Sequence, residues 1–215
     1  LGDLVLPAGS VDESLVRIRN AARRILEAKK ISFGLGGEHL VSLPLIEAAL
    51  EAYPDLVVFH WDAHADLRDS YLGAFLSHAT VMRRVVERVG KERVIPFGVR
   101  SGTREEWTWM RNHGGPRPLT PERVEEALDS MKGAPIYLTL DLDVLDPGEF
   151  PGTGTPEPGG ARFTELSCCI TALRKRSANV VALDVVELAP PCDPSGASAV
   201  AAAKAVRELL LVLPA

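Results

Sequence analysis

The sequence contains no run of about 18 uncharged apolar residues, which is the length that a helix needs to cross a membrane. One apolar stretch, residues 199–213, is interrupted by Lys204, Arg207 and Glu208, so we expect an amphipathic helix there. There is also no basic block, and the formal net charge is −5. We therefore expect neither a membrane span nor a nucleic-acid partner.

Cysteine is scarce, with three residues, of which Cys168 and Cys169 are adjacent. Such a pattern is a poor disulfide framework and favours a reducing compartment. The first residues do not resemble a secretion signal, so we expect a cytoplasmic protein. Repeats and low-complexity linkers are absent from the 215 residues, and 46% of the residues are hydrophobic. This composition predicts one domain, residues 1–215, with its own core.

Short apolar runs alternate with longer amphipathic segments along the chain. Ser10 and Glu13 form a predicted capping box, and Thr120 with Pro121 marks a second helix start. We expect strands at 31–35, 55–61, 93–99, 135–143 and 179–184, and helices after Ser10, at 40–52, at 78–90, between Pro121 and Gly133, at 164–176 and at 198–212. This alternation predicts an α/β fold with a mainly parallel sheet covered on both faces.

Acidic and histidine side chains gather where predicted strands end. Asp62, His64 and Asp66 follow one strand at every second position, and extended backbone places such side chains on one face. Asp141 and Asp143 repeat the spacing after another apolar run. His39 follows Gly36-Gly37 after a third strand. In parallel α/β sheets these carboxyl ends form one edge, where sites are found.

Four carboxylates and two imidazoles suit a pair of divalent cations, since four negative charges balance two such ions. Oxygen and nitrogen ligands without thiolate favour Mn²⁺, with Fe, Co and Zn as alternatives. Two ions roughly 3.5–4 Å apart can share a water and lower its pKa. A single Asp-x-His pair is more typical of a surface turn. The two acidic clusters together, each closing a buried strand, predict a binuclear metal site.

Several other polar residues leave alternatives open. His78 is either a partly exposed histidine at a helix start or a proton shuttle, because imidazole titrates near neutral pH. We expect the ring of His60 to face away from Asp62 and its fellow ligands and to pack in the core. Glu187 is either a solvated loop charge or a partner for a guanidinium group. The Gly/Pro-rich loop 151–160 is expected to form a wall of the site.

The order of these motifs resembles that of the ureohydrolase family, which includes arginases and agmatinases. The matching segments are GGEH (36–39), DAHADLRD (62–69), SHAT (77–80), GVRSG (98–102), DLDVLDP (141–147), PGTGTPEPGG (151–160) and DVVELAPPCD (184–193). The resemblance implies an arginase-like three-layer α/β/α fold, two Mn²⁺ ions per chain, and attack of hydroxide on a guanidinium carbon to release urea.

Residue by residue, the resemblance implies that the metal ligands are His39, Asp62, His64, Asp66, Asp141 and Asp143. Asp62 and Asp141 would bridge the two ions. His78 falls at the position of the proton-shuttling histidine. Glu187 falls at the position of the carboxylate that holds the guanidinium group.

The resemblance also implies that the substrate is a small guanidino compound. Arg68 stands where arginases carry an Asn that reads an amino-acid carboxylate, so the chain looks more like agmatinases, which convert agmatine to putrescine and urea. Guanidinobutyrate and arginine are alternative substrates. Relatives have several tens of residues before the segment that matches Leu1, so we expect the family's amino-terminal segment to be missing. A homo-trimer or homo-hexamer is implied.

Two further hypotheses are open. The first is a single-zinc deacetylase, because histone-deacetylase-like proteins share the fold and the Asp-x-His pair. The complete second-metal set (His39, Asp66 and Asp143) argues against it. The second is a non-catalytic metal-binding fragment with the same fold.

Overall fold

A computed structural model describes residues 2–213, and a single five-stranded sheet forms its centre. Its strands are β1 (Ser32–Leu35), β2 (Val57–Trp61), β3 (Val94–Phe97), β4 (Ile136–Asp141) and β5 (Val180–Val186). The spatial order is β1-β5-β4-β2-β3, and each pair of neighbours is parallel. All five carboxyl ends therefore lie along one edge of the sheet.

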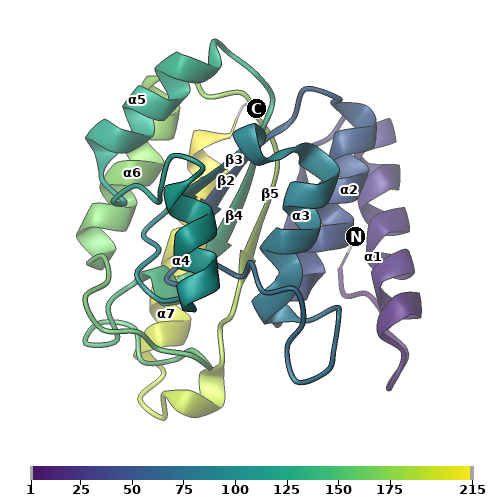
Figure 1. Cartoon of the computed structure of the whole chain (residues 1–215), viewed down its shortest axis with the longest axis horizontal. Helices are drawn as coiled ribbons and strands as arrows, with labels where there is room; N and C mark the ends of the chain where they lie inside the picture. Colours follow the sequence, from purple (N-terminus) through teal and green to yellow (C-terminus); the bar gives the residue numbers. More distant parts are fainter. Residues whose placement is uncertain (1, 214–215) are drawn as a thin grey trace.

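Helices cover both faces of this sheet (Figure 1). One layer contains α1 (Val11–Glu27), α2 (Ser42–Ala52) and α3 (Val81–Val89), and the other contains α5 (Pro121–Met131), α6 (Phe163–Lys175) and α7 (Ala197–Val212). Each layer forms a separate hydrophobic cluster against the sheet. Because β2, β4 and β5 are buried along their whole length, their sequences are apolar runs rather than alternating ones. The predicted α/β architecture is confirmed.

The predicted strands and helices are all present, with shifts at their ends. The strand predicted over 135–143 ends at Asp141, and a 3-10 turn, Leu142–Val144, follows it. The capping box predicted at Ser10 is only half formed, since the Ser10 hydroxyl accepts the Glu13 N–H and no return bond is made. One helix, α4 (Arg104–Arg111), was not predicted.

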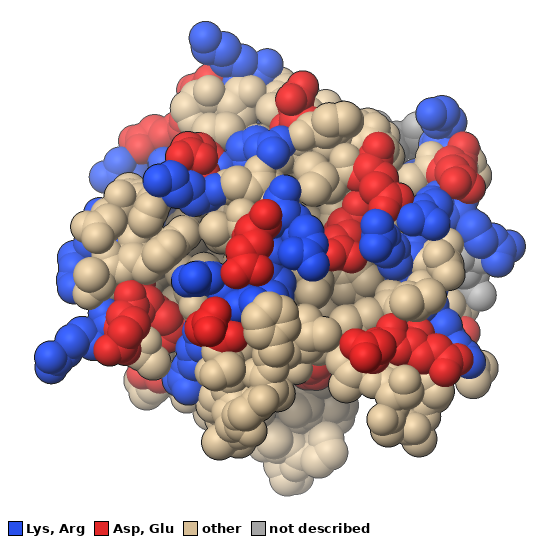
Figure 2. Space-filling view, turned by 45° about the vertical axis from the view of Figure 1, so that its right-hand side comes forward, with Lys and Arg blue, Asp and Glu red and all other residues tan. Residues whose placement is uncertain are grey.

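Ion pairs link the helices of the first layer at the surface. Arg19 and Arg88 both contact Glu47, at 3.3 and 2.9 Å, and Arg23 contacts Glu51 at 2.9 Å. Figure 2 shows Lys and Arg side chains interspersed with Asp and Glu side chains over the face that it presents. Exposed pairs of this kind add little stability. Within residues 2–213, no helix combines the length and apolar character that a membrane crossing requires.

Candidate metal centre and substrate pocket

The segment after β2 carries three of the predicted ligands along the sheet edge. The Asp62 N–H donates to the Phe97 carbonyl at 3.1 Å, so the chain still follows β3 beyond the end of β2. His64 then forms an isolated bridge with Ser101. The chain bends at Ala63, where Asp62 Oδ1 accepts the His64 N–H at 2.5 Å, and Asp66 has a φ of 51°, in the left-handed region. The three side chains therefore come together through turns after β2, and not through the continuous extended backbone that we predicted.

His39 forms the centre of the first group of predicted ligands. It opens a 3-10 turn, His39–Val41, after β1 and is fully buried. Its Nδ1 lies 3.1 Å from Asp62 Oδ2, 3.2 Å from Asp66 Oδ2 and 3.2 Å from Asp141 Oδ2. This nitrogen makes no hydrogen bond within the described residues. A buried nitrogen without a partner, facing three carboxylate oxygens, suits a divalent cation.

His64 forms the second group with Asp143 and Asp62. Its Nδ1 lies 2.9 Å from Asp143 Oδ2 and 3.7 Å from Asp62 Oδ1. Backbone amides fix the carboxylates, because Asp143 Oδ1 accepts the Ala63 N–H at 3.0 Å and Asp141 Oδ1 accepts the Asp143 N–H at 2.8 Å. Asp62 thus contributes one oxygen to each group, which is the arrangement expected of a bridging ligand. The six predicted ligands therefore lie together in two adjoining groups.

The electrostatics of this cluster favour the binding of positive charge. Burial, followed by the charge of Asp62, raises the pKa of Asp66 to about 7. Burial and the neighbouring Asp143 and Asp62 also raise the pKa of Asp141 well above its usual range. Burial disfavours the charged form of His64, but Asp143 and Asp62 outweigh it and raise its pKa to about 11. Protons would supply the positive charge in the absence of metal, and the donor set fits divalent cations that replace them.

His60 does not lie where we predicted. Its Nε2 is 2.7 Å from Asp62 Oδ2, its ring centroid is 5.5 Å from that of His39, and its side chain is buried. The prediction that this ring faces away from the ligands was wrong. His60 and Asp62 are two residues apart, so strand geometry places them on the same face.

Glu187 lies directly beyond β5, beside His39. Its Oε1 accepts the His39 N–H at 2.8 Å, and its own N–H donates to the Gly37 carbonyl at 2.8 Å. Its φ is 65°, so the chain turns sharply at this residue. Burial raises the pKa of its carboxyl group, and the His39 N–H opposes this effect. A cationic group beside Glu187 would offset the cost of burying its charge.

A cavity of about 250 Å³ opens beside the predicted metal ligands. Its lining combines the predicted ligands His64, Asp66, Asp141 and Asp143 with Arg68, Tyr71, His78, Ser101, Thr103, Glu106, Thr155 and Glu187. The His78 side chain is 40% exposed, its Nδ1 lies 3.6 Å from Glu38 Oε2, and its ring meets the Tyr71 ring edge-on at 5.3 Å. His78 and Glu187 therefore face the same cavity from two different segments.

Comparison with known proteins identifies the family. A family model described as the arginase family matches residues 1–212. The chain belongs to the arginase family. The agmatinase of Bacillus anthracis is 46% identical over 212 residues, which are 98% of this chain and 73% of that protein. A solved structure from Clostridium difficile has a TM-score of 0.94 and 42% identity, and the match covers 98% of this chain and 77% of that chain.

The arginase-like fold that the motifs implied is confirmed as well. The solved arginase of Bacillus subtilis has a TM-score of 0.85 and 25% identity, and the match covers 98% of this chain and 83% of that chain. Arginase-family membership agrees with the acidic strand ends and with the cluster built from them. The amino-acid sequence alone had predicted that these acidic residues lie at one edge of the sheet.

In this arginase-family chain, the loop 151–160 is held over the cluster by Arg100. The Arg100 guanidinium donates to the carbonyls of Glu157 at 2.7 Å and Asp143 at 2.8 Å, which joins the loop to the turn after β4. Thr155, from the same loop, donates its hydroxyl to Asp143 Oδ2 at 3.2 Å. The loop therefore forms one wall of the cavity, as predicted.

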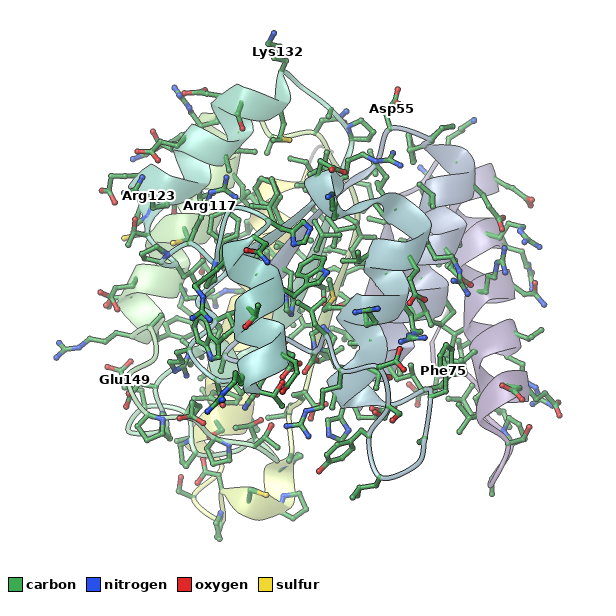
Figure 3. All side chains as sticks on the ribbon, in the orientation of Figure 1. Asp55, Phe75, Arg117, Arg123, Lys132 and Glu149 are labelled. Carbon is green, nitrogen blue, oxygen red and sulfur yellow. The ribbon has the colours of Figure 1, made fainter. Side chains whose placement is uncertain are left out.

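Two parts of the cavity wall were not predicted from the sequence. Glu106, from α4, accepts the N–H groups of Leu67 and Thr103, and the Thr103-to-Glu106 capping box was a signal for it. Tyr71 belongs to the segment between β2 and α3. Figure 3 labels Phe75 in that segment, and the buried Arg84 guanidinium stacks 3.7 Å from its ring centroid. No sequence pattern pointed to Tyr71.

Proposed function

We propose that this chain hydrolyses agmatine to putrescine and urea with two Mn²⁺ ions. The observation that carries the proposal is the His39 side chain, whose buried and unpartnered Nδ1 faces Asp62, Asp66 and Asp141 while Glu187 lies beside it. Cation-binding groups and a carboxylate that can hold a guanidinium group thus open on one cavity. Similarity to agmatinases adds support.

The proposed ligands divide according to their contacts. One ion would be held by His39, Asp62, Asp66 and Asp141, and the other by His64, Asp62, Asp141 and Asp143, since the resemblance makes Asp62 and Asp141 shared ligands. When bound, divalent ions in such a site lower the pKa of water, so that hydroxide is available near neutral pH.

Glu187 and His78 would act on the substrate. A planar guanidinium group can donate two parallel hydrogen bonds to the Glu187 carboxylate, which the His39 N–H holds in place. Water adds to the guanidinium carbon, and the bond from that carbon to the chain nitrogen breaks. His78 would donate a proton to this nitrogen and regain one from the proton that the added water loses, because imidazole can both donate and accept a proton. Urea and putrescine are the products.

A second candidate substrate is a guanidino acid such as guanidinobutyrate. Arg68 favours it, because a guanidinium group on the cavity wall would attract a carboxylate tail and repel an ammonium tail. Opposing this effect, Arg68 Nε lies 3.8 Å from Glu106 Oε2, and the Arg68 guanidinium lies 5.0 Å from the Tyr71 ring centroid. Glu106 thus compensates part of the Arg68 charge, so agmatine remains our proposal.

The deciding experiment measures urea release from agmatine, guanidinobutyrate and arginine by the Mn²⁺-loaded protein. We expect agmatine to give the highest kcat/KM, and Asp141→Ala to abolish release. Equal release by the two proteins would refute the proposed site. Metal analysis checks the alternatives: one ion per chain would favour the deacetylase, and tight metal binding without turnover would favour a non-catalytic protein.

We also propose the domain organisation, the cellular location and the oligomeric state of the protein. We propose a single domain over the chain, because both hydrophobic clusters pack on the same sheet. All three cysteines are free thiols, which agrees with a cytoplasmic location. We also propose a homo-trimer or homo-hexamer, which light scattering coupled to size-exclusion chromatography would test. A monomer at micromolar concentration would contradict this part.

A further inference from the structure

Behind His39, on the side away from the carboxylates, lies a chain of buried polar groups that the reaction above does not use. His39 Nε2 is 3.0 Å from the Thr139 hydroxyl, which is 2.7 Å from Asp184 Oδ1. The Tyr137 hydroxyl lies 2.5 Å from Asp184 Oδ2. All four side chains are fully buried. A buried carboxylate without a basic partner needs an explanation, since desolvation makes such a group costly.

The sheet register produces this arrangement. Thr139 of β4 is paired with Asp184 of β5, and Tyr137 lies two residues before Thr139, so it points to the same face. Asp141, at the end of the same strand, continues this row toward His39 Nδ1. One face of β4 therefore reaches both nitrogens of the His39 ring.

The direction of each hydrogen bond follows from the groups involved. An ionised carboxylate only accepts, so Tyr137 and Thr139 both donate to Asp184. Burial and the charge of Asp184 raise the pKa of Tyr137 well above its usual range, so its hydroxyl keeps the proton. With its own hydrogen directed at Asp184, the Thr139 oxygen can only accept from His39. The proton of neutral His39 is thereby assigned to Nε2, and the lone pair to Nδ1.

We propose that Asp184 is a positioning residue that acts through Thr139 to hold His39 in the tautomer whose Nδ1 can bind a divalent cation. This inference rests on the metal centre proposed above and adds two residues to it, Asp184 and Thr139. Hydrogen bonds to the second nitrogen of a metal-binding histidine orient the ring and fix its tautomer. Here two hydrogen bonds connect the Asp184 carboxylate to the His39 imidazole, with the Thr139 hydroxyl between them.

The substitution Asp184→Asn tests this role because it reverses the direction of the hydrogen bond between Thr139 and residue 184. Tyr137 still donates to the amide oxygen, so the amide NH₂ group faces Thr139 and donates to it. The Thr139 hydrogen then turns to His39 Nε2, 3.0 Å away, in preference to the more distant Ser42 hydroxyl at 3.4 Å, and this moves the ring proton to Nδ1. Thr139→Val removes the hydroxyl, whereas Thr139→Ser keeps it. Tyr137→Phe is the matched control, because it removes a bond to Asp184 and leaves the Thr139 direction unchanged.

The measurement is the Mn²⁺ dissociation constant of each variant, obtained by competition with a chelator. We expect Asp184→Asn and Thr139→Val to weaken binding by roughly 10- to 100-fold. We expect Thr139→Ser and Tyr137→Phe to stay within about threefold of the wild-type constant, far below that loss. Proton–nitrogen correlation spectra of the Zn²⁺-loaded protein, with labelled histidine, should show the His39 proton on Nε2.

Wild-type Mn²⁺ affinity in a folded Asp184→Asn protein would overturn the inference. If that variant does not fold, the Val and Ser substitutions at Thr139 decide, and equal affinities for these two would overturn it. An equal loss in Tyr137→Phe would indicate a purely structural cluster and would also overturn it. These outcomes can be told apart from a failure of the proposed function. A wild-type protein that binds Mn²⁺ but releases no urea from any guanidino compound would refute the reaction, and it would leave the proposed role of Asp184 in metal binding unaffected.

Discussion

Replacing Glu187 by Gln isolates the charge that we assign to substrate binding. The amide keeps the shape of the side chain, and its oxygen can still accept the His39 N–H that Glu187 Oε1 accepts at 2.8 Å. The other terminal atom changes from an acceptor to an NH₂ donor. It would then face the N–H groups of a guanidinium, which only donate. The variant therefore removes one hydrogen bond and one ion pair while the metal ligands stay in place.

The size of the effect follows from the burial of Glu187. Its carboxyl is about half-buried, and burial raises its pKa, so the charge is already partly desolvated before substrate arrives. Removing one partner of a buried charge pair costs about 3–5 kcal/mol. At 1.36 kcal/mol for each tenfold change, kcat/KM for agmatine should fall by roughly 100- to 5,000-fold. Mn²⁺ content should not change, because Glu187 is not among the proposed ligands.

The assay compares urea release and bound Mn²⁺ in wild type, Glu187→Gln and Glu149→Gln. Glu149 is exposed, is labelled in Figure 3, lies outside the cavity lining and accepts the Phe163 N–H at 2.8 Å. This control makes the same chemical change and should keep full activity. A Glu187→Gln protein with near wild-type kcat/KM, or one that has lost its Mn²⁺, would refute the assignment.

Three further results are expected. Mn²⁺ affinity should fall with falling pH. The pKa of Asp66 is raised to about 7 and that of Asp141 is also raised, so protons compete with the metal for these carboxylate oxygens. Equal metal content after dialysis at pH 4 and at pH 8 would contradict this. Leu138→Ala, at a fully buried site in β4, should lower the free energy of unfolding by about 2–5 kcal/mol in urea titrations. Arg68→Gln should lower kcat/KM for guanidinobutyrate relative to agmatine by about fivefold, the effect of a partly exposed charge; an unchanged ratio would argue against a role for Arg68 in tail selection.

The parallel sheet explains why much of the fold and the metal cluster could be predicted. Strand–helix alternation is visible in the sequence, and parallel pairing brings all carboxyl ends to one edge. Asp62 and His39 follow strands and Asp141 ends one, so their proximity required no knowledge of the strand order. Glu187 also follows a strand, but the sequence left its role open, and its bond to the His39 N–H depends on a contact between two distant segments.

Other features depend on contacts that a linear pattern does not contain. The capping box from Thr103 to Glu106 was visible, but the α4 that follows it has only eight residues and lies in a polar segment. Tyr71 reaches the cavity because its loop folds back over His78, and nothing local in the sequence requires that path. His60 is a different case, because period-two geometry should have placed it beside Asp62.

The structure divides the site into two parts with different physical origins. The inner part is fixed by sheet register, since β4 alone supplies Tyr137, Thr139 and Asp141 along one face, and a register shift would displace all three. The outer part, including Arg68 and Tyr71, belongs to a loop with exposed side chains. Substitutions in the outer part can therefore change the preferred substrate tail without disturbing the ligands, whereas substitutions on β4 affect metal binding and the core together.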